Sequence, residues 1–151
     1  MAWKNGVVPN STSVTAIFGP ATIFLSPIVD IPVDVATIAF LGNSPAYTIQ
    51  VNGFQSLQLH GFGILNQSAS TQTFADFGHI NFFGTSTADS AVITVSLANG
   101  LQFFDNSTAG NAAITTNAGA STNISGLASS GTTAGSIAGR GRIFLVPRHS
   151  P

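Results

Sequence analysis

Apolar residues recur along the chain in short triplets that have a polar or small residue at the centre. Residues 38–40, 57–59, 80–82 and 101–103 all have this pattern, and successive triplets begin 19, 23 and 21 residues apart. Successive side chains of a β-strand point to opposite faces, so the outer two residues of each triplet can enter a core. We therefore expect the triplets to occupy one strand position in successive coils.

Apolar runs between these triplets predict further strands in each coil. They cover residues 47–51, 63–66, 91–94 and 112–115. No helical 3.6-residue pattern is present, and the alanines of residues 109–120 are diluted by Gly, Asn and Thr, which disfavour a helix. The predicted core ladder consists of Ile38, Phe40, Leu57, Leu59, Ile80, Phe82, Ile93, Leu101, Phe103 and Ile114.

A long internal repeat strengthens this prediction. Residues 80–94 (INFFGTSTADSAVIT) and 101–115 (LQFFDNSTAGNAAIT) lie 21 positions apart and are identical at eight of fifteen positions. A fixed period of about 20 residues is typical of solenoids, in which each unit stacks on the one before it. The sequence predicts an all-β fold, a parallel β-helix (β-solenoid) of about six coils of 19 to 25 residues.

The repeat is expected to form a single β-solenoid domain over residues 1–145. Residues 14–35 fit the period less well and contain Pro27 and Pro32, which cannot donate to a strand ladder, so we expect an irregular first coil or cap there. Residues 146–151 are set apart as a tail that is either foreign to the natural sequence or disordered, because basic residues concentrate abruptly in the last dozen positions.

Charge is scarce in this chain. Only 6% of the 151 residues are charged and the formal net charge is −1, whereas about 25% charged residues is usual. Such a surface offers no electrostatic footprint for nucleic acid or for an anionic membrane. It also provides little repulsion between copies, so we expect the chain to associate with itself.

The absence of certain residue types and segments argues against several classes of function. Cysteine is absent, which removes disulfides, thiol catalysis and Cys-based metal sites. The N-terminus lacks the apolar run of a secretory signal, and no apolar stretch of about 18 residues occurs. We expect no membrane insertion, and any export signal lies outside this chain.

Five segments resemble the passenger repeats of proteobacterial autotransporter proteins: residues 45–49, 61–68, 70–74, 103–114 and 131–137. The resemblance implies a right-handed parallel β-helix displayed outside the bacterial cell, used as an adhesin, a spacer or a scaffold. A host or surface glycan is a further candidate partner beside a second copy of the chain. The chain shows no signal peptide and no translocator barrel, so the resemblance favours a passenger fragment or a shortened descendant.

The acidic residues do not form an evident active site. A carbohydrate-active β-helix enzyme would need carboxylates gathered on one face. The repeat aligns Asp89 with Gly110 and Asp105 with Gly84, so the two acids are not expected to stack, and turn roles are favoured for them. We predict no catalytic residue, no bound metal and no cofactor.

Two histidines require separate consideration. His60 and His79 lie 19 residues apart, close to one coil, which could bring their imidazoles together. A metal site needs several converging ligands, so ordinary surface or turn roles are preferred. His149 belongs to the tail.

The paired phenylalanines of the repeat allow two interpretations. Strict alternation would place Phe83 and Phe104 on the outside, where they would form an apolar association strip. A corner at Gly84 or Asp105 would instead turn both rings into the core, and this is the preferred interpretation.

Threonine is frequent enough to raise an ice-binding alternative, although no regular Thr-x-Thr row persists. The residues concerned are Thr85, Thr87, Thr94, Thr108, Thr115 and Thr116. The favoured function is that of a non-enzymatic, extracellular structural or adhesive β-solenoid that assembles into oligomers or filaments. A carbohydrate-active enzyme and an ice-binding solenoid are the alternatives.

Overall fold

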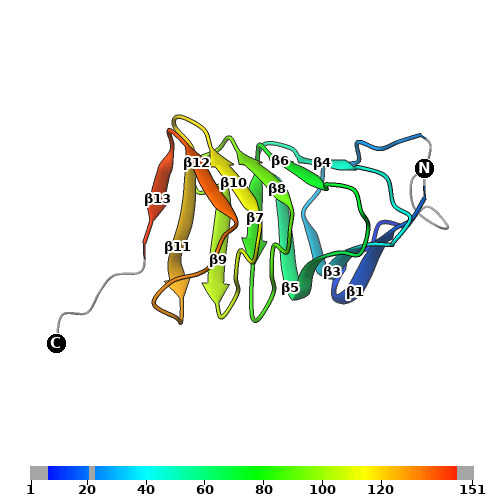
Figure 1. Cartoon of the computed structure of the whole chain (residues 1–151), viewed down its shortest axis with the longest axis horizontal. Coiled ribbons are helices and arrows are strands. Elements are labelled where there is room, and N and C mark those ends of the chain that lie inside the picture. The colour runs from blue at the N-terminus through cyan, green and yellow to red at the C-terminus, as the bar shows by residue number, and fades with distance from the viewer. Residues whose placement is uncertain (1–6, 21–22, 146–151) are drawn as a thin grey trace.

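The computed structural model describes residues 7–20 and 23–145, which form β-strands and turns without a helix (Figure 1). The strands are β1 (Ser11–Phe18), β2 (Ile28–Val29), β3 (Val33–Phe40), β4 (Thr48–Val51), β5 (Ser56–Asn66), β6 (Thr73–Asp76), β7 (His79–Phe82), β8 (Val92–Val95), β9 (Leu101–Asp105), β10 (Ala113–Thr116), β11 (Ser121–Leu127), β12 (Ser136–Gly139) and β13 (Arg142–Phe144).

The strands build two parallel sheets that wind around one interior. The first sheet has the order β1-β3-β5-β7-β9-β11-β13, and the second has the order β12-β10-β8-β6-β4-β2. Consecutive strands alternate between the sheets from β2 onward, and each coil pairs in parallel with the next, as the stacked arrows in Figure 1 show. The predicted parallel β-solenoid of about six coils is confirmed.

Alternation along the strands fills the interior. Each of β4, β6, β8 and β10 alternates between buried and more exposed positions, as expected when one face packs on a core. Register stacks like residues on top of one another: Phe82 lies over Phe103 with ring centroids 4.9 Å apart. The ten residues predicted for the core ladder are all at most 3% exposed.

Small residues of the repeat form a third side between the sheets. Thr87 bridges Gly63 in the coil before and Thr108 in the coil after. Ala88 and Ala109 are fully buried. The chain passes close to the interior there, and only small side chains leave room for that approach.

The structure corrects the predicted register at one triplet. Residues 38–40 were expected to stack on residues 57–59, but Leu57 pairs with Val33, and Ile38 pairs with Ile64. The cause is the length of β3 and β5, which carry two apolar segments each and continue from the first sheet onto the third side. Both segments of β3 satisfy the same apolar pattern, so spacing alone selects the wrong one.

The same long strand explains a second correction. Residues 63–66 were expected to be the second strand of a coil, but they form the last part of β5 and pair with β3. The second-sheet strand of that coil is β6, which pairs with β4 and β8. At the N-terminal end, the segment expected to be irregular includes most of β1, whose pairing with β3 shifts between Ser11 and Thr15. The predicted tail lies outside the described residues.

Candidate functional site

Asp89 and Asp105 hold turns together rather than forming an acidic groove. Both adopt a positive φ, at 52° and 56°, and so do the glycines that replace them in the neighbouring coil, Gly110 at 63° and Gly84 at 64°. Asp and Gly both tolerate this left-handed conformation, which accounts for their exchange in the repeat. The Asp105 Oδ2 accepts a hydrogen bond from the Gly84 N–H at 2.8 Å. Asp89 likewise accepts one from the Asn66 N–H at 2.7 Å.

The histidines lie in different rows. His60 places Nε2 3.1 Å from Asp34 Oδ1, and its ring stacks on Phe83. His79 is the register partner of Ser56, so the two imidazoles do not stack. Its Nδ1 lies 3.1 Å from the carbonyl oxygen of Asn99. Across the described residues, no group of three or more His, Asp or Glu side chains could hold a metal ion.

The phenylalanines of the repeat contradict the preferred interpretation of a corner into the core. Phe83 and Phe104 lie half-buried on the outer face of the first sheet, with ring centroids 4.8 Å apart and planes 5° from parallel. The corner comes one residue later, at Gly84 and Asp105. Together with the His60 ring, 4.9 Å from Phe83, they form a stacked outer row, which we call the aromatic row.

The threonines do not form a regular flat row. Thr94 and Thr115 are register partners on the outer face of the second sheet, but the positions on either side of them are Ala75 and Ala138. Thr116 is 1% exposed, and its hydroxyl bonds to another hydroxyl inside the solenoid. The ice-binding alternative gains no support from this pattern.

Asp76 stands before the repeat, where a turn role was expected, but it is a buried acid inside the solenoid. It lies on β6 between Val51 and Val95, and its side chain points into the interior with no exposed surface. Its Oδ1 accepts a hydrogen bond from the Gly78 N–H at 3.1 Å, while Oδ2 has no partner among the described residues. Burial raises the pKa of Asp76 to about 7, and the Gly78 hydrogen bond opposes that rise.

An exposed apolar corner was also missed. Phe54 is 91% exposed and has a φ of 66°, at the third residue of a turn closed by the Gln55 N–H and the Asn52 carbonyl oxygen. Two later turns at this corner have the same closure, with Asn99 and Gly119 at the third position. A positive φ there favours Gly or Asn and is strained for a bulky residue. The signal available in the sequence was an Asn-Gly pair followed by an aromatic residue.

The corner strip is defined here as Phe54 together with Phe77 and Leu97 on the next two coils. Phe77 is 46% exposed, and its carbonyl oxygen lies 3.5 Å from the place that a Cβ on Gly53 would occupy.

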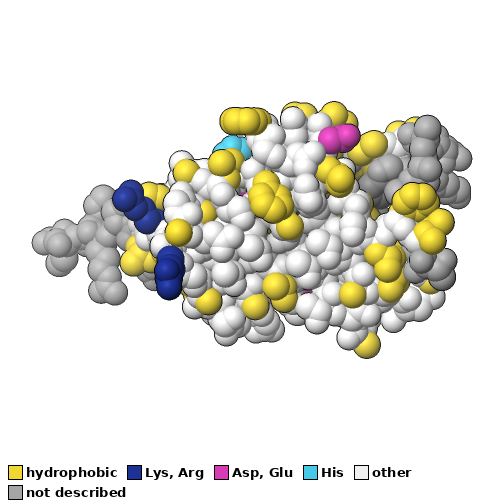
Figure 2. All heavy atoms as spheres, turned by 90° about the horizontal axis from the view of Figure 1, so that it is seen from above, with side chains coloured by type: hydrophobic (Ala, Val, Ile, Leu, Met, Phe, Trp, Pro, Cys, Tyr) yellow, Lys and Arg dark blue, Asp and Glu magenta, His cyan; other side chains and the backbone are white. Residues whose placement is uncertain are grey.

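Figure 2 shows one face of the molecule, on which hydrophobic side chains are spread among uncharged polar ones and charged side chains are few.

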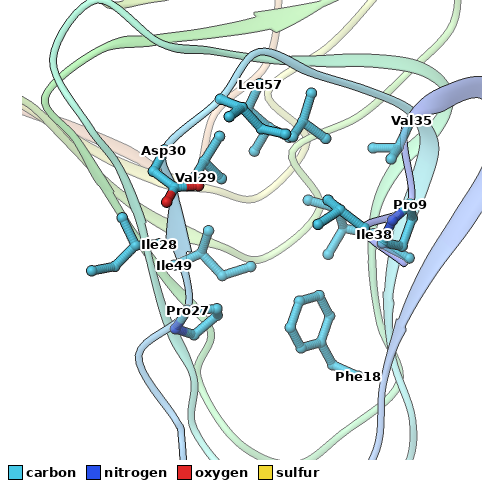
Figure 3. A pocket seen from close by; sticks show the side chains of 14 residues that line it. Pro9, Phe18, Pro27, Ile28, Val29, Asp30, Val35, Ile38, Ile49 and Leu57 are labelled. Carbon is cyan, nitrogen blue, oxygen red and sulfur yellow. The ribbon is translucent and has the colours of Figure 1, made fainter. Parts of the chain in front are cut away.

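A cavity of about 200 Å³ lies inside the first coils, at the N-terminal end of the solenoid. Figure 3 shows the residues from Pro27 to Asp30 on one wall and Phe18, Val35 and Ile38 on the opposite wall. Of the described residues that line it, Asp30 alone is charged.

Comparisons with protein-family models, with curated proteins and with solved structures found no match to this chain. The class of protein is therefore defined by the fold alone, that of the parallel β-solenoids. A search of the described residues for a helix of sufficient length and hydrophobicity to cross a bilayer found none.

Proposed function

We propose that this chain is a structural or adhesive β-solenoid that acts outside the cell and associates with further copies of itself through the corner strip. The observation that carries the proposal is Phe54, an aromatic side chain that is both strained and almost fully exposed. The extracellular setting and the adhesive role rest on the resemblance to autotransporter passenger repeats.

Local stability does not account for Phe54. Its side chain buries little surface, so it gains little from the hydrophobic effect, which scales with the apolar area removed from water. A left-handed conformation costs a non-glycine residue roughly 1–2 kcal/mol. Strained residues of this kind persist most often where they serve a function.

The surroundings of Phe54 favour contact with an uncharged apolar surface. Phe77 is exposed and Leu97 is half-buried; they follow the corresponding strands β6 and β8 of the next two coils, and none of the three positions is charged. Aromatic residues dominate the energy of protein interfaces when they enter desolvated pockets. A second copy supplies a surface with the same low charge, so no electrostatic penalty opposes the contact.

Sedimentation velocity over a concentration series tests this proposal with Phe54→Asn. We expect the variant to weaken self-association about tenfold, since loss of one buried aromatic contact costs about 1.4 kcal/mol or more. The variant should fold, because Asn99 occupies the equivalent turn position. Phe62→Asn is the matched control, because Phe62 is 77% exposed but lies outside the corner strip.

Equal association of Phe54→Asn and the unmodified chain would refute the role of the corner strip. Equal losses of self-association affinity in Phe54→Asn and Phe62→Asn would also contradict it, because they would indicate nonspecific association through any exposed apolar side chain.

A further inference from the structure

The cavity at the N-terminal end has the composition of a ligand site. Its walls come from β1, β2, β3 and the starts of the next coil, and include Phe18, Val35, Ile38 and Leu57. Phe18 and Pro27 line the cavity from opposite walls (Figure 3).

The size and polarity of the cavity define what it can hold. An engineered cavity of 150 Å³ with aliphatic and aromatic walls stays free of water and binds benzene. The cavity here measures about 200 Å³, and its lining is almost entirely apolar. It therefore suits a compact apolar group of about the size of a substituted benzene ring, and it is too small for a long acyl chain.

Asp30 adds a charge preference at the rim. It is exposed and lines the cavity, and among the described residues its carboxylate has no ion pair or hydrogen bond. Among the described residues, no positively charged side chain lines the cavity to neutralise it. A ligand with a cationic group at this edge gains the interaction, whereas an anionic ligand is repelled.

We infer that this cavity is a binding site for small amines with an apolar body, which place the body between Phe18, Ile38 and Leu57 and the ammonium group beside Asp30. The contribution of an exposed carboxylate is modest, so the charge preference is severalfold while the apolar walls supply most of the affinity.

Methyl NMR spectroscopy of the full chain tests the inference with three probes of similar shape: benzylamine, toluene and benzoate. At neutral pH, we expect benzylamine to shift the methyl signals of Val35, Ile38 and Leu57. Toluene should shift the same signals with about fivefold weaker affinity, and benzoate should bind at least tenfold more weakly than benzylamine.

Two variants separate the two parts of the site. Asp30→Asn should abolish the fivefold preference for benzylamine and leave toluene binding unchanged. Ala16→Leu, which adds bulk at a lining position that is 4% exposed, should abolish binding of both. Ala75→Leu is the matched control, because Ala75 lies on β6, outside the cavity lining, and it should bind like the unmodified chain.

Three results would overturn the inference. They are unshifted lining signals with all three probes, benzoate binding as tight as that of benzylamine, and an unchanged benzylamine preference in Asp30→Asn. The last readout does not depend on whether Ala16→Leu folds.

Discussion

Asp76 occupies an interior position that valine fills in the coils on either side. Val51 and Val95 are its register partners, and all three side chains are fully buried. A carboxyl group at this place can remain neutral only if its pKa is raised, and burial raises the pKa of Asp76 to about 7. The residue therefore makes the stability of the solenoid depend on pH.

The free energy of unfolding should fall as pH rises from about 4 to about 7. In this window the unfolded chain has released the Asp76 proton, because its pKa is about 3.9 there, while the folded chain retains it up to a pKa of about 7. The unfolded state then binds fewer protons, so stability decreases with pH, by up to about 4 kcal/mol for a shift of about three units.

Urea unfolding at pH 4, 5.5 and 7.5 measures this slope, and Asp76→Asn provides the comparison. The variant keeps an oxygen for the Gly78 N–H but cannot ionise, so it should lack the part of the slope that Asp76 contributes. Parallel pH profiles for the two proteins would show that the pKa of Asp76 is the same in the folded and unfolded states, which would contradict the raised pKa.

At the residue scale, the sequence predicted the apolar side chains that face the interior, but it did not predict the buried acid Asp76 or the exposed Phe54. Apolar alternation identifies Ile80 and Phe82 because burial of apolar surface is the dominant force. Asp76 lies at an inward position of the same alternation, but its burial was not predicted because a search for apolar residues passes over an acid. Phe54 was hidden for the opposite reason, since its exposure depends on a turn geometry that hydrophobicity does not encode.

At the scale of elements, the bend in β5 depends on the close approach of two coils. Gly63 has a φ of 83°, and a Cβ there would lie 2.3 Å from the Thr87 carbonyl oxygen and 2.6 Å from the Thr87 nitrogen. Gly119 has the same φ, but a Cβ there would meet nothing within 4 Å. Alanine substitutions at Gly63 and Gly119 therefore separate the cost of backbone strain, which both share, from the cost of steric overlap, which only Gly63 has.

Gly63→Ala should destabilise the protein by more than Gly119→Ala. The second substitution carries only the left-handed penalty of roughly 1–2 kcal/mol, whereas the first must also displace the backbone of the adjacent coil. Thermal and urea unfolding of both variants would measure the difference. Similar losses would show that the approach of Gly63 to Thr87 is not tight.

The aromatic row offers a test of coupling between coils. The ring centroids of Phe83 and Phe104 lie 4.8 Å apart. Stacked aromatic pairs contribute about 0.5–1.5 kcal/mol to stability beyond the burial of their surface. A double-mutant cycle with Phe83→Leu and Phe104→Leu should yield a coupling energy in that range. Additive losses would indicate that the two rings stabilise their own coils independently.

Elements were predicted well where one coil copies the next and poorly where strands change length. The repeat between residues 80–94 and 101–115 fixes the pairing of β7 with β9 and of β8 with β10. The coils before it have long strands that turn a corner. There the 19-residue spacing predicted the wrong register, because residues 57–59 pair with residues 33–35 rather than with residues 38–40. The outward pair of Phe83 and Phe104 agrees with strict alternation, and the corner lies at Gly84 and Asp105, where the sequence placed it. The preferred interpretation was wrong because the chain turns only after both rings have pointed outward.

At the scale of the whole molecule, stacked coils give a rod whose surface carries few charges. Charged residues make up 6% of the chain, and the described residues contain one close contact between a basic and an acidic side chain, that of His60 Nε2 with Asp34 Oδ1 at 3.1 Å. Long-range repulsion between copies is therefore weak at every salt concentration. Association through apolar side chains should strengthen in sulfate, which favours burial of apolar surface.

The most direct test of the central claim, self-association through apolar contacts, is the molar mass of the unmodified chain in solution. Light scattering should be recorded over a range of protein concentrations, with and without ammonium sulfate. The proposal predicts a mass above that of the 15.4 kDa chain, which rises with protein concentration and with sulfate. A mass equal to that of one chain under every condition would contradict it.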